Sequence, residues 1–336
     1  MAKRILVTGG LGFIGSHTVV ELQSEGFEVV IIDNLYNSKI EVLDNITKIS
    51  GIKPAYVNLD LRDKEAVTSF FNSQNVDGVI HFAASKAVGE SVQKPLEYYE
   101  NNIASLIYVL SAMQKNKVSN FIFSSSCTVY GQADELPITE NAPIKFAESP
   151  YGNTKQIGEE IITDTTKTSD LNAIALRYFN PTGAHPSAII GELPIGVPQN
   201  LIPFITQTGA GIRAELSVFG DDYPTVDGTA VRDYIHVVDL AKAHIVALKR
   251  LMEGTNKTQF ETFNIGTGKG NSVLEVIKAF EKVSGKSLNY KIVGRREGDI
   301  TAAYADTTLA NNELGWKAVQ TIDDALRDAW KWQQTL

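Results

Sequence analysis

Cysteine and long apolar segments are both scarce in this sequence. Cys127 is the only cysteine among 336 residues, so no disulfide can form within the chain. A single thiol suits a reducing compartment, and we expect a cytoplasmic protein. No apolar run approaches the about 18 residues that a membrane-spanning helix needs, and the first residues lack the features of a cleavable leader. We therefore expect no membrane association.

Positive charge is also in short supply. The chain has 31 lysines and arginines against 39 aspartates and glutamates, a formal net charge of −8. This balance argues against nucleic acid or an anionic membrane as the main partner. An anionic small molecule would need cations concentrated at its binding site. The hydrophobic content of 43% and the charged content of 21% are typical of a globular enzyme.

Short apolar runs alternate with helical patterns through the first half of the chain. This alternation indicates βαβ units and a parallel sheet with right-handed crossovers. We therefore predict a doubly wound α/β Rossmann domain over residues 1–180, and the clearest helix covers 95–115. The expected strands are 4–7, 29–32, 55–59, 78–83, 121–124 and 173–178.

The regular alternation ends near residue 180. Residues 181–230 are rich in proline and glycine, which disfavour long elements, and we expect loops there. Helical and strand patterns return at 239–251, 262–265 and 272–283. We predict that 181–336 is a smaller C-terminal α/β lobe that binds substrate, with some strands and helices returning to the first domain.

A glycine-rich turn follows the first expected strand. Gly9, Gly12 and Gly15 are spaced so that the backbone can turn tightly and a pyrophosphate can approach a helix N-terminus. Asp33 ends the second strand, where an acidic residue binds the adenosine ribose hydroxyls. No arginine follows in residues 34–38, which favours NAD over NADP. Three glycines alone could form a plain turn, and Asp33 alone could cap a helix.

Tyr151 and Lys155 form a Tyr-x-x-x-Lys pair that lies on one face of a helix. A phenol with a pKa of about 10 is a poor base, but a nearby ammonium favours the phenolate. Ser126 ends the fifth strand, and ligands of doubly wound sheets bind at such carboxyl ends. Ser124 and Ser125 are expected to be structural. The spacing alone also fits an ordinary surface pair. The catalytic interpretation therefore depends on the position of the pair, shortly after the end of the fifth strand.

Long segments of the chain resemble the extended short-chain dehydrogenase/reductase family, and in particular its members that epimerise UDP-hexoses. The segments are VTGGLGFIGSHT, IIDNLYNSK, HFAASKAVGESVQKPLEYYENN, FIFSSSCTVYG, SPYGNTK, LRYFNPTGAHPS, VFGDDYPTVDGTAVRDYIHVVDLA, FNIGTG and GRREGD. Together they run nearly from end to end. The resemblance implies a homodimer that binds NAD and a UDP-hexose, with no metal.

The resemblance also implies a role for each matched residue. The catalytic residues would be Tyr151, Lys155 and Ser126. The cofactor would contact Gly9, Gly12, Phe13, Ile14, Gly15, Asp33, Asn34, Asn37, Ser38, Asp60, Leu61, Phe82, Ala83, Ala84, Lys86, Asn101, Ser126, Tyr151, Lys155 and Phe179. The substrate would contact Lys86, Ser126, Tyr151, Asn180, Asn200, Leu201, Ser217, Phe219, Arg232, Arg296, Asp299 and Ala303.

The implied reaction is the reversible epimerisation of UDP-glucose and UDP-galactose at carbon 4. Tyr151 would remove the 4-hydroxyl proton while hydride passes to bound NAD, and the 4-keto sugar would swing about its phosphate linkage before hydride returns. Arg232 and Arg296 would supply the concentrated positive charge, because guanidinium groups suit diphosphate oxygens. Either arginine alone could be an ordinary surface residue, and Phe219 could be core rather than a uracil contact.

Ala303 invites a hypothesis on substrate range. Some family members carry tyrosine there and act on UDP-hexoses alone, whereas members with a small residue also accept N-acetylhexosamines. Ala303 therefore predicts turnover of UDP-GlcNAc and UDP-GalNAc, unless other walls block the acetamido group.

Two residues depart from the family pattern, and two other functions were considered. Cys127 and Ala188 stand where relatives often carry alanine and glycine, and we expect Cys127 to be a buried packing residue. A sugar-nucleotide 4,6-dehydratase shares the fold but needs an adjacent acid pair, where this chain has Cys127 and Thr128. A non-catalytic NAD(H)-sensing protein would be expected to lack Tyr151 or Lys155.

Overall fold

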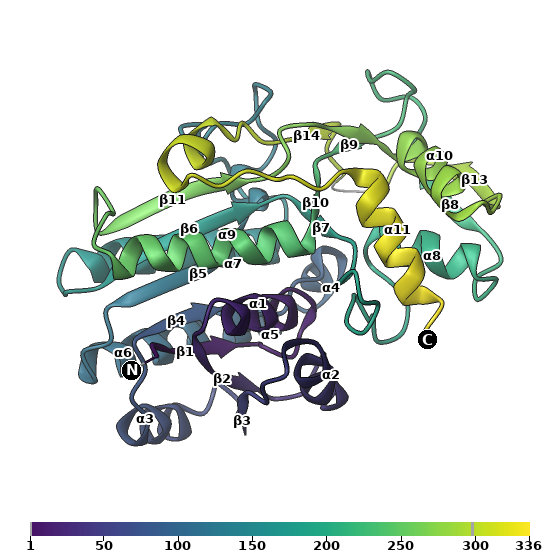
Figure 1. Cartoon of the computed structure of the whole chain (residues 1–336). Coiled ribbons are helices and arrows are strands. Elements are labelled where there is room, and N and C mark those ends of the chain that lie inside the picture. The colour runs from purple at the N-terminus through teal and green to yellow at the C-terminus, as the bar shows by residue number, and fades with distance from the viewer. Residues whose placement is uncertain (1, 297–298) are drawn as a thin grey trace.

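A seven-stranded parallel sheet forms the centre of the larger half of the molecule (Figure 1). The computed structural model describes residues 2–296 and 299–336. The strand order is β11-β6-β5-β4-β1-β2-β3. The strands are β1 (Arg4–Thr8), β2 (Glu28–Asp33), β3 (Ala55–Asn58), β4 (Gly78–His81), β5 (Asn120–Ser126), β6 (Asn172–Tyr178) and β11 (Phe260–Ile265). The predicted α/β class with a doubly wound parallel sheet is confirmed.

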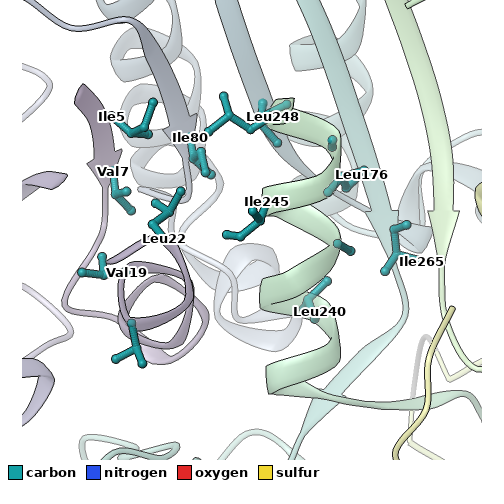
Figure 2. Packing of buried hydrophobic residues seen from close by; sticks show 14 of the residues in the cluster. Ile5, Val7, Val19, Leu22, Ile80, Leu176, Leu240, Ile245, Leu248 and Ile265 are labelled. Atoms are coloured by element: carbon teal, nitrogen blue, oxygen red, sulfur yellow. The ribbon is translucent and has the colours of Figure 1, made fainter. Parts of the chain in front are cut away.

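Helices cover both faces of this sheet, which explains why its strands are nearly continuous apolar runs. One face packs against α1 (Phe13–Ser24), α2 (Glu41–Ser50) and α9 (Val237–Met252). Figure 2 shows Leu240, Ile245 and Leu248 of α9 in one buried cluster with side chains of the sheet and of α1, among them Leu22. The other face packs against α3 (Lys64–Ser73), α6 (Ser105–Lys115) and α7 (Pro150–Thr166).

The helix expected over 95–115 is interrupted. It consists of α5 (Pro95–Tyr99), a π-helical turn η1 (Glu100–Ala104) and α6 (Ser105–Lys115), and α4 (Val88–Gln93) precedes it. A π-helical turn adds one residue to the helical ladder and often marks a functional site. Here it carries Asn101 and Asn102 towards the segment that follows β4, through hydrogen bonds described below.

Residues 181–230 contain more regular structure than their proline and glycine content predicts. This segment includes α8 (Leu201–Gly209) and β8 (Leu216–Phe219). Pro203 is tolerated because it lies in the first turn of α8, where backbone N–H groups have no helical partner. Ile202 and Ile205 of α8 are buried against the C-terminal helix α11 (Ile322–Gln333), so tertiary packing stabilises a short helix that local composition disfavours.

The smaller lobe lies beyond the carboxyl ends of the central strands (Figure 1). It is built from α8, α10 (Val273–Ser284), α11 and three small sheets, β10-β7, β12-β9-β14 and β13-β8. The remaining elements are η2 (Cys127–Tyr130), β7 (Asn180–Thr182), β9 (Val231–Arg232), β10 (Tyr234–His236), β12 (Asn271–Ser272), β13 (Tyr290–Val293), β14 (Ala302–Ala303) and η3 (Ala310–Leu314). Among the described residues, no helix has the length and apolar character needed to span a bilayer.

Candidate active site

The glycine turn between β1 and α1 is closely packed. Gly9 has a positive φ of 67°, and a Cβ there would lie 2.9 Å from the backbone nitrogen of Ala83. A Cβ on Gly15 would lie 2.3 Å from the carbonyl oxygen of Gly9. Gly12 precedes the first residue of α1, Phe13, and no side chain caps the free N–H groups at that end. The turn therefore offers backbone donors to a phosphate without obstruction by side chains.

Asp33 links this turn to the loop after β2. One carboxylate oxygen accepts the backbone N–H of Leu11 at 3.1 Å, and the other accepts from Leu35 N and Ser38 Oγ. Asp33 is therefore placed beside the glycine turn, where the predicted adenosine ribose would lie. Of the other predicted contacts in this loop, Asn34 is exposed and bonds to Asp60, and Asn37 is exposed.

Asp60 follows β3 at the same edge of the sheet, and Leu61 beside it is buried. Hydrogen bonds from the Arg62 guanidinium lower the pKa of Asp60 to about 2. Arg62 is a nearby cation that lies outside residues 34–38, the segment on which the predicted preference for NAD was based. Because Asp60 already pairs with this guanidinium, Arg62 is a poor partner for a 2′-phosphate, and the preference for NAD stands.

The segment after β4 contains Phe82, Ala83, Ala84 and Lys86. Asn102 holds this segment, since its side chain accepts from Ser85 N at 2.8 Å and donates to Ser85 O at 3.0 Å. Asn101 donates to the Ser85 hydroxyl. Asn102 also donates to Thr154 Oγ1 on α7 at 3.0 Å, one residue before Lys155. Asn102 was not predicted; it joins the cofactor segment to the catalytic helix, and the unexpected π-helical turn is the feature that places it.

Tyr151 and Lys155 lie at the start of α7, next to the carboxyl end of β5. Ser149 caps this helix by accepting from Gly152 N, and Pro150 fits its first position. Lys155 Nζ donates to the carbonyl oxygen of Ser124 at 2.6 Å and lies 5.8 Å from the centre of the Tyr151 ring. The structure thus brings Tyr151 and Lys155 together beside the end of β5, where Ser126 is the last residue.

Burial governs the pKa values of this pair in the protein chain by itself. Burial raises the pKa of Tyr151 well above its ordinary value, Tyr178 raises it further, and the hydrogen bond with Ser126 acts in the opposite direction. Burial also lowers the pKa of Lys155 to about 8. In the protein chain by itself, desolvation of the Tyr151 phenol outweighs the attraction of the Lys155 ammonium, so the expected phenolate requires the positive charge of the nicotinamide as well.

Ser124 and Ser125 are structural, as predicted, and they point to opposite sides of β5. Ser124 hydrogen bonds with the Tyr178 hydroxyl. Ser125 Oγ donates to Glu159 Oε1 at 2.5 Å, one turn beyond Lys155 on α7. Ser126 caps η2 by accepting from Thr128 N at 3.2 Å.

Glu159 is the centre of a buried polar network behind the catalytic pair. Its carboxylate is bound at two points by Arg177 of β6, at 2.9 and 2.5 Å. Arg177 also donates to the Tyr130 hydroxyl at 3.0 Å, and Tyr130 donates to Asn264 at 2.7 Å. Sequence analysis missed this network, although the i, i+4 spacing of Lys155 and Glu159 pointed to a shared helix face. The network fixes α7 against β5 and so fixes the catalytic side chains.

Three predicted UDP contacts, Arg232, Arg296 and Asp299, lie close together. Asp299 Oδ1 lies 2.7 Å from Arg296 Nη2 and 3.7 Å from Arg232 Nη2. The Arg296 guanidinium lies 5.5 Å from the centre of the Phe219 ring on β8, the strand that also carries Ser217. Positive charge is therefore concentrated here, as an anionic ligand requires. Glu297 and Gly298 of the same motif lie outside the described residues.

The remaining predicted substrate residues come from several elements. Asn180 begins β7, while Asn200 and Leu201 lie at the start of α8. Asn200 donates to the Glu192 carboxylate at 2.6 Å, a contact that the sequence did not predict. Phe179 and Ala303 are buried in one apolar cluster with Val129, and Ala303 pairs with Arg232 across adjacent strands. Ala303 is only 3% exposed. A larger side chain at this position would displace its neighbours or extend into the proposed sugar site.

The two departures from the expected pattern also have structural explanations. Burial raises the pKa of the Cys127 thiol to about 12, consistent with an unreactive packing residue rather than a nucleophile. Ala188 has a φ of 55°, in the left-handed region that favours glycine. Cys127 and Thr128 cannot supply the acid pair that a 4,6-dehydratase requires.

Comparison with known proteins places the chain in a family. Residues 6–329 match the family model described as GDP-mannose 4,6 dehydratase. The UDP-glucose 4-epimerase of Bacillus subtilis (strain 168) is 50% identical over 332 residues, which cover 98% of this chain and 97% of that protein. The epimerase of Drosophila melanogaster is also 50% identical, over 98% of this chain.

A solved structure gives the same result. The Stenotrophomonas maltophila UDP-glucose-4-epimerase with bound NAD and formylated UDP-arabinopyranose is 49% identical, with a TM-score of 0.96 over 99% of this chain and 98% of that chain. The fold and the site define an extended short-chain dehydrogenase/reductase of the sugar-nucleotide class. Within that class, the chain belongs to the UDP-glucose 4-epimerase family.

Proposed function

We propose that this protein interconverts UDP-glucose and UDP-galactose by inverting carbon 4, with NAD as its bound cofactor. The observation that carries the proposal is that Tyr151, Lys155 and Ser126 gather at the end of β5, while Ala303, the strand partner of Arg232, packs against Val129 of the segment that follows Ser126. Arg232 and Arg296 share the Asp299 carboxylate. A hexose joined to UDP has its reacting hydroxyl at one end and its diphosphate at the other. The site has the matching arrangement of a proton-transfer group and a cationic group.

NAD fits the residues of the larger half. The glycine turn admits a pyrophosphate at the start of α1, and the Asp33 carboxylate, beside that turn, suits ribose hydroxyls. Ser38, Asp60 and Leu61 would complete the adenosine end, and the segment from Phe82 to Lys86 with Asn101 would line the middle. When bound, NAD supplies a reversible hydride acceptor for carbon 4 of the sugar.

The catalytic residues of this chain would move one proton. Tyr151 accepts the proton of the 4-hydroxyl and later returns it, and Ser126 donates a hydrogen bond to the same oxygen. Because burial raises the pKa of Tyr151, the phenolate needs positive charge next to it. Lys155 supplies part of that charge, and its pKa of about 8 leaves it mainly protonated at neutral pH.

The UDP portion would be held apart from the reacting ring. Arg232 and Arg296 would bind the diphosphate, Phe219 would stack on uracil, and Ser217, Asn180 and Leu201 would complete the pocket. If the nucleotide is fixed at this end, the 4-keto sugar can turn about its phosphate linkage and present its other face. The same catalytic residues then serve both directions of the reaction.

The substrate range is proposed to include N-acetylated UDP-hexosamines. Ala303 is the small residue on which this depends, and it lies beside Arg232 and Phe179. Absence of UDP-GalNAc turnover, at enzyme concentrations that fully convert UDP-galactose, would contradict this part of the proposal. Ala303→Tyr is expected to retain activity on UDP-galactose and to lose activity on UDP-GalNAc.

We also propose that the protein is a cytoplasmic homodimer and that residues 181–336 form the substrate lobe. Apolar side chains are exposed along α4 to α6, including Val92, Leu96 at 80% exposure and Ile107. Pairing these helices with those of a second copy would cover them. Light scattering is expected to give twice the chain mass, and Leu96→Lys with Ile107→Lys to reduce it. The single cysteine supports the proposed compartment.

The direct test of function is product identity. Purified protein is incubated with UDP-galactose, and the nucleotide sugars are separated by chromatography. UDP-glucose is the expected product. A 4-keto-6-deoxy sugar would indicate dehydration, and unchanged UDP-galactose would remove the proposed activity.

A further inference from the structure

The carboxylate of Glu192 joins two predicted substrate residues that come from different halves of the molecule. Glu192 Oε1 accepts from Asn200 Nδ2 at 2.6 Å and lies 3.5 Å from Lys86 Nζ. Lys86 follows β4 of the central sheet, whereas Asn200 precedes α8 of the smaller lobe. The side chain of Glu192 is 14% exposed, whereas that of Lys86 is 45% exposed.

Trp332 near the end of α11 holds the backbone that carries this carboxylate. Its indole Nε1 donates to the carbonyl oxygen of Glu192 at 2.9 Å. The indole also packs directly on Gly191, where a Cβ would lie 2.4 Å from Trp332 Cδ1. The position of Glu192 is therefore set by a half-buried ring from a distant part of the chain.

This arrangement gives Lys86 and Asn200 a common acceptor. An ammonium and an amide each have several N–H donors, and one bond to a shared carboxylate orients those that remain. Lys86 is a predicted contact of both the cofactor and the substrate, and Asn200 is a predicted contact of the UDP-sugar. A carboxylate there cannot attract the UDP portion, because the charges are alike.

We propose that Glu192 is a positioning residue that orients Lys86 and Asn200 for the hexose ring, and that Trp332 sets its position. The inference rests on the proposed function, since it assigns a role within the same site. It predicts that loss of the carboxylate impairs hexose turnover and leaves recognition of the nucleotide intact. A purely structural link between the two halves would instead affect stability and both ligand portions together.

The first test compares Glu192→Gln with the exposed control Glu253→Gln. Glu192→Gln is expected to lower kcat/KM for UDP-galactose roughly tenfold, the loss typical of a charge-assisted hydrogen bond. The inhibition constant of UDP alone is expected to stay within about twofold of the wild-type value. The control is expected to match wild type. An unchanged kcat/KM, or an equal loss of UDP affinity, would overturn the inference.

A double-mutant cycle tests whether Glu192 acts through Lys86. Lys86→Met and Glu192→Gln are measured singly and together. If the carboxylate works by orienting the ammonium, the combined loss in kcat/KM is smaller than the product of the separate losses. Strictly multiplicative losses would contradict the proposed role.

Trp316 provides a matched control for the proposed role of Trp332. Trp316 also donates its indole N–H to a backbone carbonyl, that of Asp239, at 3.0 Å and away from the site. Trp332→Phe is expected to lower kcat/KM for UDP-galactose about threefold, whereas Trp316→Phe at a similar thermal stability leaves it unchanged. Equal effects would remove Trp332 from the proposal. Failure of the wild-type protein itself to convert UDP-galactose would instead reject the proposed function.

Discussion

The two ends of the site are built differently. At the catalytic end, Tyr151, Lys155 and Ser126 are all buried, and the Glu159–Arg177 ion pair behind them is buried as well. At the nucleotide end, Arg296 is 56% exposed and its carboxylate partner Asp299 is shared with Arg232. The Tyr151 end is fixed by a buried ion pair, whereas the arginine end has cations that a diphosphate can bind in place of Asp299.

This difference fits the different functions proposed for the two ends, proton transfer at one and nucleotide binding at the other. Proton transfer requires groups fixed within a fraction of an ångström, and a buried network provides that. Binding and release of a charged nucleotide require cations that water and ligand can reach. Substitutions at the catalytic end should therefore alter kcat or stability, whereas those at the nucleotide end should alter KM.

The largest effect is expected for Tyr151→Phe. Removing the proposed proton-transfer group should lower kcat by about a thousandfold or more. Bound NAD should remain, because the glycine turn and Asp33 are untouched. Activity and the cofactor content of the purified variant are the measurements, and Tyr290→Phe on the exposed strand β13 is the control. Substantial activity in Tyr151→Phe would show that another group carries the proton.

Glu159→Gln should have the next largest effect, and chiefly on stability. It leaves the buried Arg177 charge without its partner, which typically costs about 3–5 kcal/mol of unfolding free energy. Denaturant unfolding measures the loss. The double variant Glu159→Gln with Arg177→Met should recover part of it. Asp299→Asn should change stability less, because its partner Arg296 is 56% exposed and can be solvated. A loss below about 1 kcal/mol for Glu159→Gln would contradict the difference between the ends.

Arg296→Met should weaken substrate binding without affecting the fold. We expect KM for UDP-galactose to rise about tenfold, because a charge-assisted contact with the diphosphate is lost. Unfolding free energy should stay within about 0.5 kcal/mol, as is usual for exposed sites. Arg295→Met is the matched control, since Arg295 is bound to Asp222 and stacked on Tyr223. Equal effects of the two variants would remove Arg296 from the binding site.

The smallest effect concerns the pH dependence of stability. Burial lowers the pKa of Lys155 to about 8, below its ordinary value of 10.5. Between these values the unfolded chain holds a proton that the folded chain has released, so Lys155 makes stability rise with pH in this window. Lys155→Met should lack that contribution, and its stability relative to wild type should fall from pH 7 to 10. A constant difference in thermal unfolding would show that Lys155 is not perturbed.

The sequence predicts the larger half better than the smaller lobe for a physical reason. Strands such as Arg4–Thr8 are buried on both faces and carry their signal locally, and the glycine turn and Asp33 follow in fixed order. Helix α8 was missed because it depends on packing against α11, more than a hundred residues away. The interrupted helix at Glu100–Ala104 depends on one additional residue that no local pattern reveals.

The same reasoning separates the site residues. Tyr151, Lys155 and Ser126 were predicted because their spacing follows from a helix and a strand end. Glu192 was missed because Trp332 positions it, and that contact joins segments 140 residues apart. The extent to which burial raises the pKa of Tyr151 could not be predicted either, since burial is a property of the folded chain and not of the Tyr-x-x-x-Lys spacing.

The proposed reaction inverts carbon 4 within one active site by a hydride that leaves and returns. The most direct test uses UDP-galactose with deuterium at carbon 4, incubated in ordinary water with purified protein and no added NAD. If the hydride returns to carbon 4, the product is UDP-glucose that retains the deuterium at carbon 4. UDP-glucose that has lost the label to water would contradict the proposed reaction, because inversion would then proceed by exchange of a proton with the solvent.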